Sequence, residues 1–97
     1  MTISANTRRV LNQKYGVTLL GFADRHEADF GADIAQDIRE AASIIAGKTV
    51  ERDGRKALLL RLQNHVDAIG CLIGHTAKEI ANWRLVMCSL VVRLETP

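Results

Sequence analysis

The stretch "IGCLIGHTAKEIANW", residues 69–83, decides how the C-terminal half of this chain folds. It places Gly70 and Gly74 inside a strongly helical pattern, where each glycine costs about 1 kcal/mol relative to alanine. The glycines can begin a strip of small residues, continued by Ala77 and Ala81, that lets a second helix approach closely. They can instead mark a break in the helix. We expect close helix packing at these four residues.

Apolar residues recur every three or four positions on both sides of this stretch, as in a coiled coil. With Leu59 as position a of a heptad, the apolar seam continues to Leu94, and Thr76 is its single polar member. This pattern predicts one long helix. The residues expected to form the seam of the core or of a dimer are Leu59, Leu62, Val66, Ile69, Ile73 and Ile80.

Shorter segments precede the long helix. Asn6 is expected to cap a short first helix that ends at Gly16, and Gly47 is expected to end the second helix. The fold class is therefore all-α, with one domain built as a helical hairpin or bundle. In chain order, we expect a short N-terminal helix with a connector, a medium acidic amphipathic helix, a charged loop and the long heptad-patterned helix, over residues 1–23, 24–47, 48–56 and 57–94.

The second helix is too short to cover the long one. About 23 residues span roughly 35 Å, whereas about 38 residues span roughly 57 Å. Part of the apolar seam would then remain open to water. We therefore expect the bundle to be completed by self-association as a homodimer.

Composition narrows the class of partner. Hydrophobic residues make up 47% of the 97 residues and charged residues 25%, which is typical of a folded domain. Aromatic residues, at 4%, are too few for platforms that stack single-stranded nucleic acid, and a net charge of +2 does not by itself indicate a nucleic-acid or membrane partner. Neither a signal peptide nor an apolar run of ~20 residues is recognisable, so the expected location is cytoplasmic.

One set of residues has the spacing that a metal site or a catalytic site on a helix would need. Asp67, Cys71, His75 and Glu79 recur at intervals of four and would share one face of a helix. Cys71 and His75 could act as two metal ligands, or as a thiolate beside a base. A structural zinc site needs four ligands, however, and the chain has no second such pair. We expect a polar outer surface here, with no catalytic residue, no metal site and no cofactor.

The segment "HTAKE", residues 75–79, partly resembles the His-x-Leu-Lys-Gly pattern of histidine phosphotransfer domains, which are helical bundles. His75 and Lys78 match this pattern, whereas Ala77 and Glu79 depart from it. The resemblance implies that His75 accepts a phosphoryl group and that Lys78 supports it electrostatically. Glu79 would obstruct an incoming domain and repel the phosphoryl group, so this function is kept as an alternative.

Nucleic-acid binding is a second alternative function. A basic cluster between residues 48 and 61 could contact phosphates, although Glu51 and Asp53 are interleaved with it. The cluster consists of Lys48, Arg52, Arg55, Lys56 and Arg61.

The segment that follows Trp83 is apolar on nearly every side, which favours a protein-binding surface. We expect a small non-enzymatic regulator, of the inhibitor, antiactivator or adaptor kind, that binds a larger protein through this helical surface. The residues expected to contact the partner are Trp83, Arg84, Met87, Leu90 and Val91.

Overall fold

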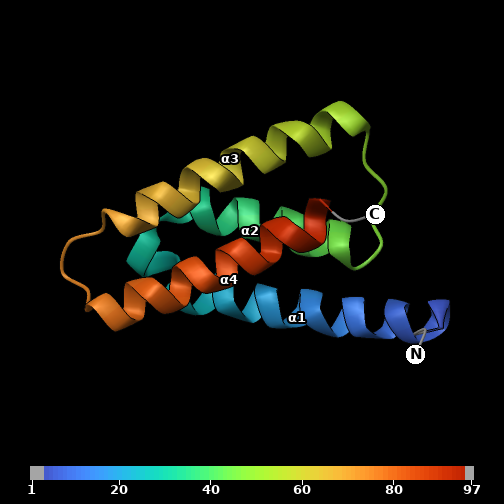
Figure 1. Ribbon diagram of the computed structural model, residues 1–97, viewed down its shortest axis with the longest axis horizontal. Helices are drawn as coiled ribbons and strands as arrows, with labels where there is room; N and C mark the ends of the chain where they lie inside the picture. The colour runs from blue at the N-terminus through green and yellow to red at the C-terminus, as the bar shows by residue number, and fades with distance from the viewer. Residues whose placement is uncertain (1–3, 96–97) are drawn as a thin grey trace. The chain divides into compact units, whose positions relative to one another are not determined.

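The computed structural model describes residues 4–95, and all of its regular elements are α-helices (Figure 1). In chain order these are α1 (Ala5–Phe30), α2 (Ala32–Ile45), α3 (Arg52–Gly70) and α4 (Ala77–Glu95). No strand occurs among the described residues, so the all-α prediction is confirmed. The chain divides between Val50 and Glu51 into two compact units, one containing α1 and α2 and the other α3 and α4. The expectation of a single domain stays a prediction.

The first helix is longer than the sequence pattern predicted. Its N-terminus is capped by Ser4, whose hydroxyl accepts a hydrogen bond of 3.2 Å from the Thr7 backbone N–H. The helix then runs without interruption to Phe30, where Gly31 adopts φ 101° and ψ 157°, a conformation that is essentially confined to glycine. The predicted cap at Asn6 and the predicted end at Gly16 are therefore wrong.

The helix continues through Gly16 because this glycine is a packing site. A Cβ atom built on Gly16 would lie 2.9 Å from the Ala42 carbonyl oxygen and 3.2 Å from the Ala46 Cβ atom. The α2 backbone thus lies so close to α1 that a side chain at residue 16 would force it away. The packing gained there offsets the cost of about 1 kcal/mol that glycine brings to a helix interior.

The second predicted helix has the expected apolar face, but it begins at a different residue. The apolar residues that recur every three or four positions along it are buried: Phe30, Ile34, Ile38, Ala42 and Ile45. Gly47 has φ 124° just after α2 ends, so the predicted end at this glycine is confirmed. The predicted start at Asp24 is wrong, because residues 24–30 are the last turns of α1.

An ion-pair network joins α1 to α2. The Arg39 guanidinium group of α2 reaches two acids of α1, with 2.8 Å from Nη2 to Asp24 Oδ1 and 2.8 Å from Nη1 to Glu27 Oε1. The hydrogen bond to Asp24, followed by that to Glu27, raises the pKa of Arg39 above its ordinary value. Two acids of the predicted acidic segment, Asp24 and Glu27, therefore help to hold α1 and α2 together.

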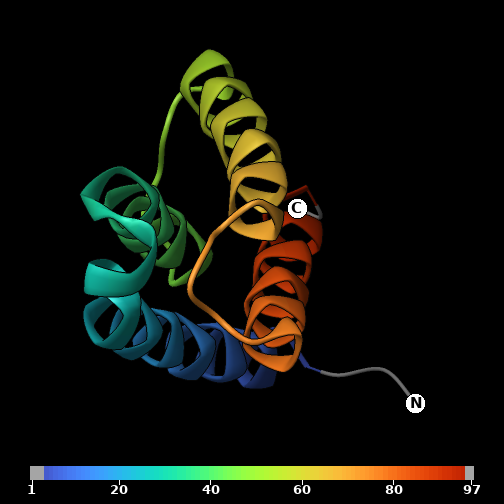
Figure 2. The same ribbon diagram turned by 90° about the vertical axis from the view of Figure 1, so that its left-hand side faces the viewer.

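The helices α3 and α4 form a second hairpin, which Figure 2 shows from its loop end. Arg55, at the start of α3, donates a hydrogen bond of 3.0 Å from Nε to the carbonyl oxygen of Leu94, at the end of α4. This guanidinium group satisfies a carbonyl that the helix itself leaves without a partner. The single long helix predicted over residues 57–94 is wrong, because two helices share this length.

A short connection at residues 71–76 separates α3 from α4. Gly74 has φ 90° within it, which a residue with a side chain adopts only with strain. Thr76 and Glu79 then start α4 with a capping box. The Glu79 backbone N–H donates to Thr76 Oγ1 at 3.1 Å, and the Thr76 backbone N–H donates to Glu79 Oε1 at 3.4 Å.

Candidate interaction surfaces

Most of the predicted partner-binding residues lie inside the protein. Met87 and Leu90 have no exposed surface, and Trp83 and Val91 are at most 9% exposed. Arg84 is exposed, and its side chain covers Gly70: a Cβ atom built there would lie 3.6 Å from Arg84 Cδ. Periodicity identified an apolar helix correctly, but these four apolar side chains belong to the core and form no open surface.

The predicted seam is divided between α3, the connection and α4. Leu62 and Ile69 are buried, whereas Ile73 is 95% exposed in the connection. The other three, Leu59, Val66 and Ile80, are half-buried. The seam therefore contributes to the packing of the second hairpin but is not one continuous line, and its role in a dimer stays a prediction.

The four residues expected to allow close helix packing do not share a helix face. Gly70 ends α3, Gly74 lies in the connection, and Ala77 begins α4. Ala81 is exposed. That prediction is wrong because the helix breaks where the glycines occur. In this chain, the close approach of two helices is made at Gly16 instead.

His75 is packed against its own hairpin. Its ring lies 4.8 Å from the Trp83 ring in an edge-on arrangement, its Nδ1 atom lies 3.6 Å from Glu79 Oε2, and its side chain is 18% exposed. It belongs to the connection before α4, whereas the resemblance to phosphotransfer domains implies a histidine on an exposed helix. The structure therefore does not support His75 and Lys78 as a phosphoacceptor site.

The set of four that shared a predicted helix face is divided between α3, the connection and α4, and of its members His75 and Glu79 lie 3.6 Å apart. Asp67 lies on α3, Cys71 and His75 lie in the connection, and Glu79 lies on α4. Within residues 4–95 there is no group of three or more His, Cys, Asp or Glu side chains placed to hold a metal ion.

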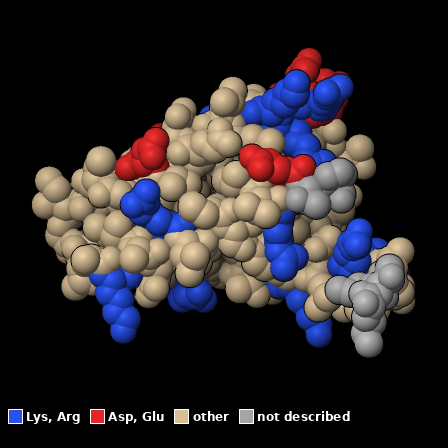
Figure 3. Space-filling model, viewed as in Figure 1, with Lys and Arg blue, Asp and Glu red and all other residues tan. Residues whose placement is uncertain are grey.

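The residues of the basic cluster do not form a continuous positive surface, and acidic side chains lie among them. Arg55 is bound to the end of α4, as described above, while Arg52 and Lys56 are exposed in the first turns of α3. Figure 3 shows acidic side chains among the basic ones at the start of α3. Arg61 follows farther along α3, and Lys48 precedes it in the loop after α2. Such mixed charge favours a solvated surface over a phosphate-binding one.

A first exposed apolar surface lies on α1 and was missed in the sequence. Val10, Val17 and Leu20 share one face of the helix, because they are seven and three residues apart. They are 42%, 69% and 39% exposed, on the side away from the buried Leu19 and Phe22. We call these three residues the α1 stripe. The prediction that the first helix ends at Gly16 concealed the α1 stripe, because Val17 and Leu20 were then assigned to a connector.

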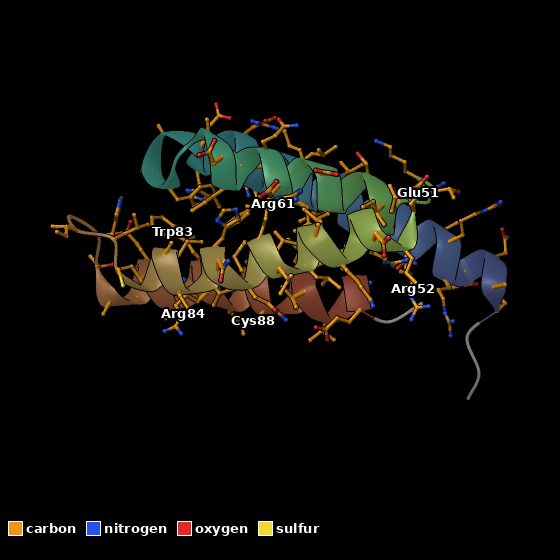
Figure 4. The ribbon with its side chains drawn as sticks, turned by 90° about the horizontal axis from the view of Figure 1, so that it is seen from above. Glu51, Arg52, Arg61, Trp83, Arg84 and Cys88 are labelled. Atoms are coloured by element: carbon orange, nitrogen blue, oxygen red, sulfur yellow. The ribbon has the colours of Figure 1, made fainter. Side chains whose placement is uncertain are left out.

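A second exposed surface lies on α4. Leu85 and Val92 are 70% and 60% exposed, and Ala81 and Cys88 are exposed on the same face. Figure 4 shows Cys88 and Trp83 on opposite sides of the helix. We call these four residues the α4 stripe. Its spacing of four, three and four residues was visible in the sequence, but it belongs to a second heptad phase beside the buried one.

Comparison with protein-family models, with curated protein sequences and with solved structures gives no match for this chain. Among the described residues, no helix has the combination of length and apolar character that crossing a bilayer requires.

Proposed function

We propose that this protein is a small non-enzymatic regulator that binds a larger protein through the α1 stripe. The observation that supports this proposal is the exposure of three large apolar side chains, aligned on one face of a 26-residue helix. Single exposed apolar residues are common on any protein surface, whereas a contiguous apolar patch is typical of an interaction site.

The surroundings of the α1 stripe suggest the chemistry of the partner. Arg9 and Lys14 are exposed on either side of its first half. A complementary surface would be an apolar groove with acidic residues along its rim, into which an amphipathic helix places anchors at three- and seven-residue spacing. Val17, the most exposed of the three, would be the central anchor.

Self-association is the second part of the proposal. Two hairpins that each leave large apolar side chains in water would gain from pairing with another copy, so we propose that the protein acts as a homodimer. Support comes from the α4 stripe, which remains exposed after α3 and α4 have packed together.

Partner binding can be tested with two variants of equal size and equal charge change. Val17→Asp places a carboxylate in the middle of the α1 stripe, whereas Thr18→Asp places the same group on an exposed neighbouring face. Both tagged variants and the unmodified protein would be used to recover partners from a lysate after nuclease treatment, at two salt concentrations. Circular dichroism would establish that all three proteins are equally helical.

We expect the unmodified protein and the Thr18→Asp variant to retain the same protein, and the Val17→Asp variant to lose it. Retention by the Val17→Asp variant would exclude the α1 stripe as the binding surface. Recovery of nucleic acid alone, lost at high salt, would replace the proposal with the basic-cluster alternative, since phosphate contacts weaken steeply as salt rises.

A further inference from the structure

We propose that two copies of this chain pair through their α4 stripes, with the two α4 helices antiparallel. This inference rests on the self-association proposed above and adds the surface, the register and the orientation of the contact.

The stripe continues at both ends into charged residues that keep the same spacing. Successive members are three or four residues apart throughout, which is the spacing of the a and d positions along one seam of a coiled coil. All of them are exposed in the structure: Lys78, Ala81, Leu85, Cys88, Val92 and Glu95. A helix of 19 residues therefore carries a complete two-heptad seam in addition to the one that packs on α3.

The charges at the two ends select the orientation. When two copies run antiparallel about the middle of this seam, Lys78 faces Glu95 of the second copy, and the symmetric contact repeats this ion pair. Ala81 then faces Val92 of the second copy, and Leu85 faces Cys88. A parallel pairing would instead place lysine against lysine and glutamate against glutamate, which is repulsive. The seam is thus complementary to itself in one orientation only.

The flanks of the seam allow the contact to close without burying an unpaired charge. On one side lie the uncharged Asn82 and Ser89. On the other side, Arg84 is folded across Gly70 of α3. Buried charges without partners would oppose association. The seam is short, since 19 residues span about 28 Å, so we expect a dimer that dissociates on dilution.

Orientation can be tested by cross-linking. Both natural cysteines would first be replaced, as Cys71→Ser and Cys88→Ala, and Ala81→Cys or Val92→Cys would then be added to this background. In the antiparallel pair, residue 81 of one copy is opposite residue 92 of the other. The two copies of residue 81 are then separated by 11 residues of helix, or about 16 Å along the axis.

We expect a short bis-maleimide to join the two variants when they are mixed, giving the mixed product by mass spectrometry, and to join neither variant to itself. Cross-linking of each variant to itself would overturn the antiparallel orientation. Equal yields in all three samples would show random collision and would also overturn the proposal.

Charge exchange tests the same contact without a cross-linker. Lys78→Glu replaces two attractive pairs with two repulsive ones, and we expect the dimer dissociation constant to rise about tenfold at low salt. The double variant Lys78→Glu/Glu95→Lys restores opposite charges and should restore the constant. Both changes suit the helix dipole, so loss of the dimer would not reflect loss of α4. Lys56→Glu, on the exposed surface of α3, is the matched control and should leave the constant unchanged.

Sedimentation equilibrium over a range of protein concentrations tests separately whether the protein self-associates and whether it does so through α4. A dimer that is indifferent to Lys78→Glu and to Leu85→Asp would overturn the α4 contact while leaving self-association intact. A monomer at every concentration would overturn both. A dimer weakened by these two changes and restored by the double exchange is the expected result.

Discussion

At the scale of single residues, a missing side chain sets how closely the first two helices pack. Gly16 lies in the middle of α1, where its lack of a Cβ atom leaves room for the Ala42 carbonyl oxygen of α2. In the sequence, a glycine after a run of polar residues resembles a helix end, and nothing local distinguishes the two roles. The distinction comes from a residue 26 positions away, so short-range patterns could not have predicted it.

We expect Gly16→Ala to lower the free energy of unfolding by up to about 2 kcal/mol. The added methyl group would force the α2 backbone away, which costs about 1–3 kcal/mol, while the higher helix propensity of alanine returns about 1 kcal/mol. Urea denaturation followed by circular dichroism would measure the change.

Gly21 supplies the control on the same helix. A Cβ atom there meets only the end of the flexible Arg25 side chain, at 3.3 Å. Gly21→Ala should therefore be neutral or stabilising by up to about 1 kcal/mol. Equal destabilisation by both changes would contradict the packing role assigned to Gly16.

At the scale of the elements, the beginning of α4 shows why one helix becomes two. The heptad pattern passes through residues 71–76 because Ile73 and Thr76 happen to keep its phase, yet Ile73 is almost fully exposed. The local signals were present in the sequence: Gly74 permits a positive φ, and Thr76 followed by Glu79 is the signature of a capping box. The heptad periodicity extends over the whole segment, so it predicted one helix in spite of these signals. By contrast, the end of α2 at Gly47 was predicted correctly from the same kind of residue.

We expect Thr76→Ala to destabilise the protein by about 1 kcal/mol, because the Glu79 N–H loses the hydroxyl that caps α4. Thr76→Ser keeps that oxygen and should retain most of the stability. Thermal unfolding of the three proteins at neutral pH measures the difference. A Thr76→Ala variant as stable as the unmodified protein would show that α4 does not depend on this cap.

The same change has a consequence for pH dependence. The Thr76 hydroxyl, and then the Thr76 backbone N–H, hold the pKa of Glu79 below its ordinary value. The bonds that Glu79 accepts therefore stabilise the folded protein above the ordinary range of a carboxyl group, and this stabilisation is lost as pH falls through the lowered pKa. In the Thr76→Ala variant the pKa should rise toward the ordinary value, as followed by the carboxyl carbon shift in NMR.

At the scale of the whole molecule, the sequence predicted the helical class and most of the core, but not the division into elements. The spacing of apolar residues by three and four positions places Ile34, Ile38, Leu62 and Ile69 on helix faces, and all four are buried. The same spacing could not indicate which of the two apolar faces of α4 is covered, because both faces have heptad spacing. For that reason Trp83 was assigned to a binding surface, while the exposed Leu85 and Val92 were not.

The division of the chain after Val50 also separates its two ultraviolet chromophores. The single tyrosine, Tyr15, lies on α1, and the single tryptophan, Trp83, lies on α4. Tryptophan fluorescence excited beyond the tyrosine band therefore reports on the second hairpin alone, whereas far-ultraviolet circular dichroism reports on the helices of both. If the chain is one cooperative domain, as its length and composition predict, the two denaturation curves will coincide at every denaturant concentration. Two separated midpoints would instead show that each hairpin is a folding unit with a stability of its own.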